Sequence, residues 1–222
     1  MDISAILISM KTATLSILIT FFLGILAAKL VITIKREGIK SILDGLLTMP
    51  LVLPPTVAGF FLLYLFGVKR PIGQFFVDFF SIKIAFSWGA TVLAAVVISF
   101  PLMYRSARAA FEQVDENILA AARTLGISEW NIFWKIQLPN ALPGVVSGGI
   151  LAFSRGLGEF GATAMIAGNM AGKTRTLPLA VYSAVASGDM ETAYTYVWII
   201  VGISFTVVVL MNYFGAKERK KR

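Results

Sequence analysis

The chain has 222 residues, of which 57% are hydrophobic and only 14% charged, and its formal net charge is +8. This composition is typical of an integral membrane protein and argues against a water-soluble domain, and we expect a single membrane domain over residues 1–222. The sequence has neither cysteine nor histidine and no suitable carboxylate cluster, which excludes disulfides, thiol nucleophiles and metal sites, and it offers no set of catalytic residues.

Five apolar stretches are long enough to cross a bilayer, whose core of about 30 Å needs roughly 17–25 residues of helix. They cover residues 12–34, 45–68, 84–104, 142–167 and 192–216. If the amino terminus is external, twelve of the twenty Lys and Arg fall in the segments 35–40, 105–135 and 217–222, and six fall in outer segments. Because basic residues favour the cytosolic side, this bias predicts an external amino terminus and a cytosolic carboxyl terminus.

The first span is expected to remain in the mature protein. Lys29 lies near its inner end, where we expect its ammonium group to reach the membrane surface. At the other end of the chain, the basic tail from residue 217 is expected to face anionic lipid in the cytosol.

The second span contains Pro50, Pro54 and Pro55. Proline removes a backbone donor and disturbs the preceding helical turn, so we predict a bent helix. Irregular backbone within a membrane is tolerated where protein or water satisfies it. The bend therefore fits either a helix that lines a pathway or a kink that serves packing alone.

Residues 115–139 are predicted to form a cytosolic helical hairpin. Asp115 can cap a first helix through Leu125, Gly126 can supply a left-handed turn, and Ser128 can cap a second helix that Pro139 ends. The hairpin carries many large apolar side chains, namely Leu125, Ile127, Trp130, Phe133, Trp134 and Ile136. Some of them must pack on the membrane body or on a partner protein. A hairpin that binds only lipid is the alternative, although Glu129 and Asn131 interrupt its apolar face.

The fourth span is rich in glycine, which predicts close packing between helices. Within it, Arg155 and Glu159 are four residues apart and would share a helix face. Charged groups in lipid are costly, so the pair must face protein or water. It fits a transport pathway or a buried structural ion pair. The following residues 169–187 are expected to form an outer lid, and their Gly-Lys-Thr string lacks the glycine spacing and strand of a phosphate-binding loop.

The hairpin resembles the EAA loop of ATP-binding-cassette (ABC) importer permeases. The matching residues are Ala121, Ala122, Gly126, Ile136, Leu138 and Pro139, and Ala120 stands where that family has glutamate. The strings LPLVLPPTVAG, RGLGEFGA and GKTRTLPLAVY resemble the molybdate, tungstate and sulfate permease branch. The resemblance covers nearly the entire chain.

The resemblance implies an all-α, type I ABC importer permease fold, in which residues 120–139 form coupling helices that fit a cleft of an ATPase. It also makes Pro54, Pro55, Arg155, Glu159, Thr176 and Pro178 candidates for the pathway and its gate. The chain would be a multi-pass permease of a prokaryotic inner membrane, carrying molybdate, and also tungstate, delivered by an extracytoplasmic binding protein. ATP and Mg would belong to the partner ATPase, with no cofactor or nucleic acid bound by this chain.

Two alternatives remain open. A sulfate or thiosulfate permease subunit would share the same core motifs. An ion-coupled secondary transporter would need coupling-ion groups at mid-membrane depth and usually an internal repeat, and the sequence offers neither. Because five spans are too few to enclose an anion pathway, we expect a two-fold homodimer that presents two hairpins to two ATPases.

Overall fold

The structure is a computed structural model that describes the backbone of residues 2–219 and the side chains of residues 2–209, and these residues form helices and no strands. Three long apolar helices are α1 (Ile3–Ile32), α5 (Trp88–Glu112) and α11 (Met190–Arg219). A fourth apolar stretch runs over Glu129–Leu157 and ends with α8 (Leu138–Leu157). All four are long and apolar enough to cross a membrane.

The predicted second span is a pair of helices, α2 (Glu37–Val52) and α3 (Pro55–Phe66), and the chain bends by 110° between them. Between them Leu53 is extended, with ψ 140°, because the proline that follows disfavours the helical conformation. Pro55 then begins α3 at a position where its missing N–H costs nothing. The predicted bend is confirmed, and the pair supplies the fifth candidate span.

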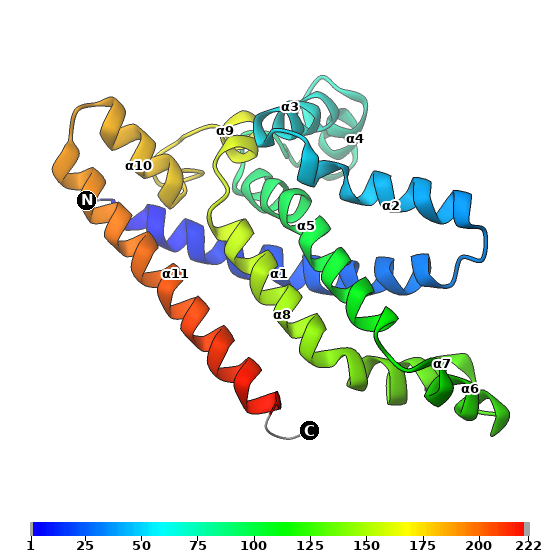
Figure 1. Ribbon diagram of the computed structural model, residues 1–222. Coiled ribbons are helices and arrows are strands. Elements are labelled where there is room, and N and C mark those ends of the chain that lie inside the picture. Colours follow the sequence, from blue (N-terminus) through cyan, green and yellow to red (C-terminus); the bar gives the residue numbers. More distant parts are fainter. Residues whose placement is uncertain (1, 220–222) are drawn as a thin grey trace.

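The centre of the molecule is formed by α1, α5 and α8, which pack along one another (Figure 1). Small residues bring these helices close: a Cβ added at Gly144 would lie 2.7 Å from Cβ of Ala110, and one added at Gly24 would lie 2.5 Å from Cγ of Met103. The α1–α5 contact also carries paired hydroxyls, such as those of Thr12 and Thr91, 2.9 Å apart. The predicted close packing of the glycine-rich span is confirmed.

Shorter helices gather around the ends of this centre. At one end lie α3, α4 (Pro71–Phe80) and α9 (Gly161–Ala167), while α10 (Leu177–Ala186) packs between α1 and α11 (Figure 1). At the other end α6 (Glu116–Thr124) and α7 (Glu129–Ile132) form the hairpin, and the π-helix η1 (Phe133–Gln137) joins α7 to α8.

The fourth span differs from its prediction at both ends. Pro139 does not end the second hairpin helix, because α7, η1 and α8 run on without interruption. Conversely, the helix predicted to continue to residue 167 ends at Leu157, and α9 begins only at Gly161. Gly158, with φ −86° and ψ 12°, caps α8, and Gly158, Glu159 and Phe160 separate the two helices.

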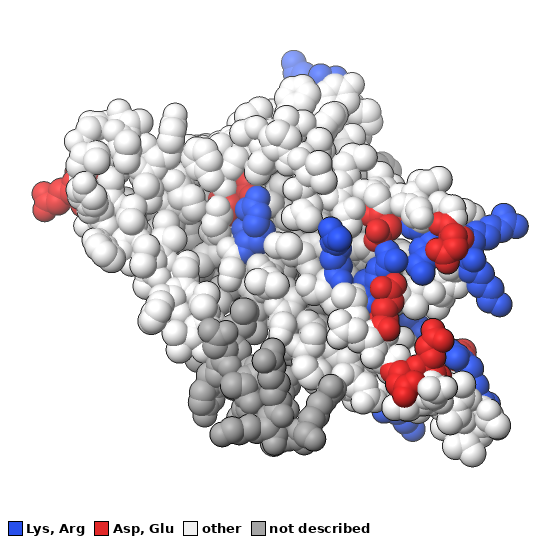
Figure 2. Space-filling model, viewed as in Figure 1, with Lys and Arg blue, Asp and Glu red and all other residues white. Residues whose placement is uncertain are grey.

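Charged side chains are distributed unevenly. Figure 2 shows that most of them on this face gather at the end of the molecule that carries the α1–α2 turn and the hairpin, whereas the middle is almost bare. This division fits a membrane-embedded middle. The prediction for the basic tail concerns side chains from residue 217 onward, which lie outside the described side chains.

Candidate functional site

The hairpin follows its predicted capping pattern. Oδ1 of Asp115 accepts from the backbone N–H of Asn117 at 2.9 Å, and the Oγ of Ser128 accepts from that of Asn131 at 3.5 Å. Gly126 is left-handed, with φ +73°. These residues act locally, because a cap satisfies the free N–H groups of its own first turn and glycine adopts positive φ without a Cβ clash.

An ion pair ties the two hairpin helices together. Nε of Arg123 lies 2.6 Å from Oε1 of Glu129, and Nη2 lies 3.4 Å from Oε2. The hydrogen bond to Glu129 raises the pKa of the Arg123 guanidinium above its usual value. Both side chains are more than half exposed, so the pair orients the hairpin while contributing little to overall stability.

The hairpin exposes an apolar surface, which we define as Leu125, Ile127, Trp130 and Trp134. Leu125 is 79% exposed and Trp130 71%, whereas Ile132 and Phe133 on the opposite side are buried in the main core. A surface with two exposed tryptophans is typical of a protein interface. Of the loop motif residues, Ala122 and Leu138 pack inward, while Ala120, Ala121 and Pro139 are exposed.

The helix passes Pro139 because of the π turn before it. In a regular α-helix a proline ring collides with the carbonyl four residues earlier. Here the N–H of Leu138 bonds to the carbonyl of Phe133, five residues back, and this wider turn leaves room for the ring. The side-chain amide of Asn140 donates to the carbonyl of Ile136 at 2.7 Å. Ile136 therefore lies in a widened joint between α7 and α8.

Arg155 and Glu159 are brought together as predicted, but not on one helix. Nη1 of Arg155 at the end of α8 lies 2.8 Å from Oε2 of Glu159, which lies in the break. The other carboxylate oxygen of Glu159 accepts from the N–H of Ala162 at 2.7 Å. Glu159 thus holds the end of α8 to the start of α9, where a negative charge is favourable.

The breaks in the second and fourth spans meet each other. A Cβ added at Gly161, the first residue of α9, would lie 3.0 Å from Cβ of Pro55, the first residue of α3. Farther along, a Cβ at Gly59 would lie 2.6 Å from Cα of Ala162. Two interrupted helices therefore touch through their amino-terminal turns, with Pro54 directly before one of them. Discontinuous helices that meet inside the membrane form substrate sites in many transporters.

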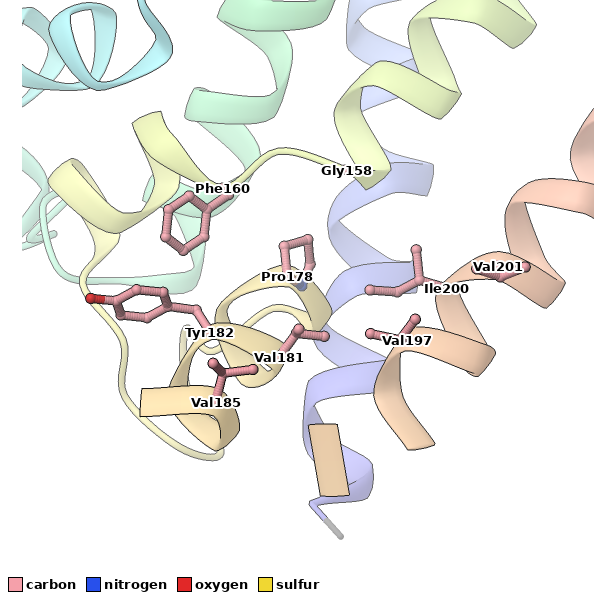
Figure 3. Close-up of a pocket in the computed structure, with 9 residues that line it drawn as sticks. All are labelled: Gly158, Phe160, Pro178, Val181, Tyr182, Val185, Val197, Ile200 and Val201. Atoms are coloured by element: carbon pink, nitrogen blue, oxygen red, sulfur yellow. The ribbon is translucent and has the colours of Figure 1, made fainter. Parts of the chain in front are cut away.

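A cavity of about 540 Å³ adjoins the fourth-span break on the side of α10 and α11 (Figure 3). It is lined by Gly158, Phe160, Pro178, Val181, Tyr182, Val185, Val197, Ile200 and Val201. The rings of Phe160 and Tyr182 approach to 5.3 Å between centroids. This lining has no charged group, so the cavity itself offers little to an anion, and Arg155 and Glu159 are not part of it.

The two gate candidates lie in different surroundings. Pro178 lines the cavity, whereas Thr176 is 4% exposed and its Oγ1 has no hydrogen-bond partner among the described residues. Beside Thr176, the N–H of Leu177 donates to the Oγ of Ser9 at 2.7 Å, which fixes the start of α10 against α1. Among the described residues, the hydroxyl of Thr176 therefore makes no hydrogen bond to the Arg155–Glu159 pair.

A polar cluster that the sequence patterns do not predict joins α2 to α5. Oδ1 of Asp44 accepts from the hydroxyl of Tyr104 at 2.8 Å and pairs with the guanidinium of Arg108, whose Nε also lies 2.8 Å from Oε1 of Glu112. Tyr104 and Arg108 are one helical turn apart, so the sequence alone indicates that the two side chains share a face of α5. Asp44 lies sixty residues earlier, so only the tertiary structure identifies it as their partner.

Comparison with known proteins places these features in a family. The family described as "Binding-protein-dependent transport system inner membrane component" matches residues 5–220. The "Molybdenum transport system permease protein ModB" of Escherichia coli K12 is 44% identical over 93% of this chain and 90% of its own length. The protein of the same name from Haemophilus influenzae is 39% identical over 100% of this chain and 96% of its own length.

Among solved structures, the fold is similar to that in inward-facing conformations of the MetNI methionine ABC transporter, with a TM-score of 0.76. That match covers 97% of this chain and 95% of the other, at 16% sequence identity. The expected all-helical fold of type I ABC importer permeases is therefore confirmed.

Proposed function

The chain belongs to the family of inner membrane components of binding-protein-dependent transport systems, and from this premise we propose that it is the subunit through which an ABC importer moves molybdate into the cell. The observation that carries the substrate is the 44% identity, over nearly the full length, to the E. coli protein whose name states molybdenum transport. Tungstate, an oxyanion of the same charge and similar shape, is expected to follow the same route.

The hairpin is the proposed docking element for an ATP-hydrolysing partner. Its apolar surface, Leu125, Ile127, Trp130 and Trp134, projects from the charged end of the molecule, and the Arg123–Glu129 pair and the turn at Gly126 fix its shape. In this proposal Ala120, Ala121 and Ala122 lie on the first coupling helix, and Ile136, Leu138 and Pro139 connect the second to α8. ATP and Mg bind to that partner, and this chain supplies no catalytic residue or cofactor.

The meeting point of the two broken spans is the proposed part of the pathway that a divalent oxyanion passes. Arg155 is 31% exposed while its partner Glu159 is 2% exposed, so part of the guanidinium is available while its charge is largely balanced. A balanced arginine attracts an anion without holding it permanently. Pro54 and Pro55 shape the same junction from the other span, and Thr176 and Pro178 belong to the outer gate.

We place the hairpin end in the cytosol and the amino terminus outside, where the extracytoplasmic binding protein delivers its anion. All of residues 1–222 then form one membrane domain that contacts lipid. In this proposal a second copy completes the pathway, because the five candidate spans of the described residues are too few to enclose it. A dimer presents two hairpins to two ATPases.

The decisive experiment uses the chain purified together with its ATPase and reconstituted in vesicles with its binding protein. We expect ATP-dependent uptake of labelled molybdate, competed strongly by tungstate and weakly by sulfate. Uptake that sulfate competes better than molybdate would identify a sulfate permease instead. Uptake that needs an ion gradient and no ATP would overturn the importer assignment.

A further inference from the structure

Lys29 occupies a place that the proposed function does not explain. Its position near the end of the first span predicts that its ammonium group reaches the membrane surface, which stays a prediction. In the structure Nζ lies 3.3 Å from Oε1 of Gln137 and 4.7 Å from the centre of the Phe133 ring. Lys29 therefore contacts the first and the last residue of the π-helix η1 (Phe133–Gln137) at the same time.

Both contacts are with buried groups. Phe133 and Gln137 are each 5% exposed, and Phe133 belongs to the main core with Ile132 and Phe111. A buried side-chain amide needs a polar partner, and an ammonium over an aromatic face is attracted by its electrons. Lys29 thus gives the side-chain amide of Gln137 a hydrogen-bond partner and lies over the Phe133 ring. Because Lys29 belongs to α1, both contacts connect η1 to α1.

The π turn lies where movement of the hairpin must enter the membrane part of the chain. The hairpin continues through η1 directly into α8, and the far end of α8 carries Arg155 and the break at Gly158. A π turn has poorer hydrogen bonding than an α-helix and is a place where helices bend. A loose joint here would absorb a displacement of the hairpin, whereas a joint held to α1 would pass it on.

We propose that Lys29 is a positioning residue that holds this π joint against α1, so that displacement of the hairpin turns α8 and the fourth-span break. The inference rests on the proposed docking of the hairpin on an ATPase. It goes beyond that docking by assigning the transmission step to a contact between α1 and η1. Lys29 is not one of the residues assigned above to the pathway or to the apolar surface of the hairpin.

The test compares Lys29→Met, Lys29→Arg and Lys11→Met in the reconstituted complex with its ATPase and binding protein. Methionine keeps an unbranched apolar stem and removes the charge, and arginine retains a cation with N–H donors. Lys11→Met is the matched control, because Lys11 lies exposed on the same helix. We expect Lys29→Met to lower the molybdate imported per ATP hydrolysed by about three-fold or more, a size appropriate to losing such a contact, while the other two stay near the parent. A parent-like ratio for Lys29→Met overturns the inference.

Gln137→Met removes the same contact from the other side and is measured alongside. If both residues act through one contact, the double variant Lys29→Met/Gln137→Met loses no more than either single variant. Fully additive losses overturn the shared contact.

Hydrogen exchange of the purified complex provides a readout that does not depend on transport. In Lys29→Met the backbone amides of residues 133–138 should exchange about ten-fold faster than in the parent, since local opening of the joint becomes easier. Lys11→Met should leave them unchanged. Unchanged exchange in Lys29→Met overturns the proposal that Lys29 holds the π turn against α1. A parent complex that imports no molybdate contradicts the proposed function, and the exchange result then still decides whether Lys29 holds the π turn.

Discussion

Arg155 and Glu159 form an ion pair across the end of a helix, with Nη1 of the arginine 2.8 Å from Oε2 of the glutamate. The two partners differ in exposure, since the side chain of Arg155 is 31% exposed and that of Glu159 only 2%. Because Glu159 also accepts from the N–H of Ala162, the pair holds α8 and α9 in register across the break.

This asymmetry predicts different effects of the two obvious substitutions. Arg155→Leu leaves the buried Glu159 charge without its partner and should cost about 3–5 kcal/mol, which would remove both folded protein and transport. Glu159→Gln keeps an oxygen for the Ala162 N–H and leaves a partly exposed arginine, so it should slow uptake more than it lowers the folded amount. Uptake rates and the amount of folded protein in membranes measure the difference. If the double leucine variant folds and transports like the parent, the pair has no role in the pathway.

Gly126 is the position at which the hairpin depends most on backbone conformation. Its φ of +73° is costly for a residue with a Cβ, yet an added Cβ would meet nothing within 4 Å. Gly126→Val should therefore cost about 1–2 kcal/mol through backbone strain alone and re-aim the hairpin, whereas Gly126→Asn should be tolerated. We expect Gly126→Val to reach the membrane but to lose ATP-driven uptake and co-purification of the ATPase. Equal uptake by both variants would exclude a strained turn as part of the coupling.

Asp44 holds α2 to the rest of the molecule through Tyr104 and Arg108. Helix α2 has no buried residue of its own, so this polar contact contributes more than an ordinary surface pair. We expect Asp44→Ala to lower the free energy of unfolding by about 1–2 kcal/mol. Glu112→Ala, which removes the other carboxylate from Arg108 within the same helix, should cost only about 0.3–0.5 kcal/mol. Thermal unfolding in detergent compares the two, and equal losses would contradict a specific role of Asp44.

The contact between α3 and α9 depends on Gly59. A Cβ there would lie 2.6 Å from Cα and 2.8 Å from the carbonyl oxygen of Ala162, and backbone atoms cannot give way as a flexible side chain can. Gly59→Ala should therefore lower the melting temperature by separating the two broken spans. Gly202→Ala in α11 meets nothing within 4 Å and should raise stability by about 0.5–1 kcal/mol through helix propensity. A stabilised Gly59→Ala variant would show that this close approach is absent in the membrane.

The proposed orientation can be measured directly, because the chain has no cysteine of its own. Lys173 and Gly38 are both exposed and lie on segments assigned to opposite sides. Lys173→Cys should react with an impermeant thiol reagent in intact cells, whereas Gly38→Cys should react only after the membrane is opened. The reverse pattern would place the hairpin outside and remove it from contact with a cytosolic ATPase.

Local features of the hairpin and the bend could be predicted because their causes are local. The cap at Asp115 needs only its own first turn, Gly126 needs only a backbone conformation free of Cβ strain, and two adjacent prolines interrupt a helix in any surroundings. Hydropathy likewise located the spans apart from the ends of the fourth, since burial of helical backbone in lipid demands a minimum apolar length.

The partners of the polar side chains depended on the tertiary structure. Lys29 near a helix end fits equally with reaching the membrane surface or with a buried partner, and only the packing of α1 against η1 selects Gln137, 108 residues later. Pro139 was expected to end a helix, but a π turn accommodates it because neighbouring helices stabilise the irregular backbone. Arg155 and Glu159 bridge two helices rather than share one, and the first residue of α9, Gly161, lies against Pro55, the first residue of α3. Such contacts join residues far apart in the chain. Their energies depend on the distances between side chains in the folded protein, and these distances cannot be read from the amino-acid sequence.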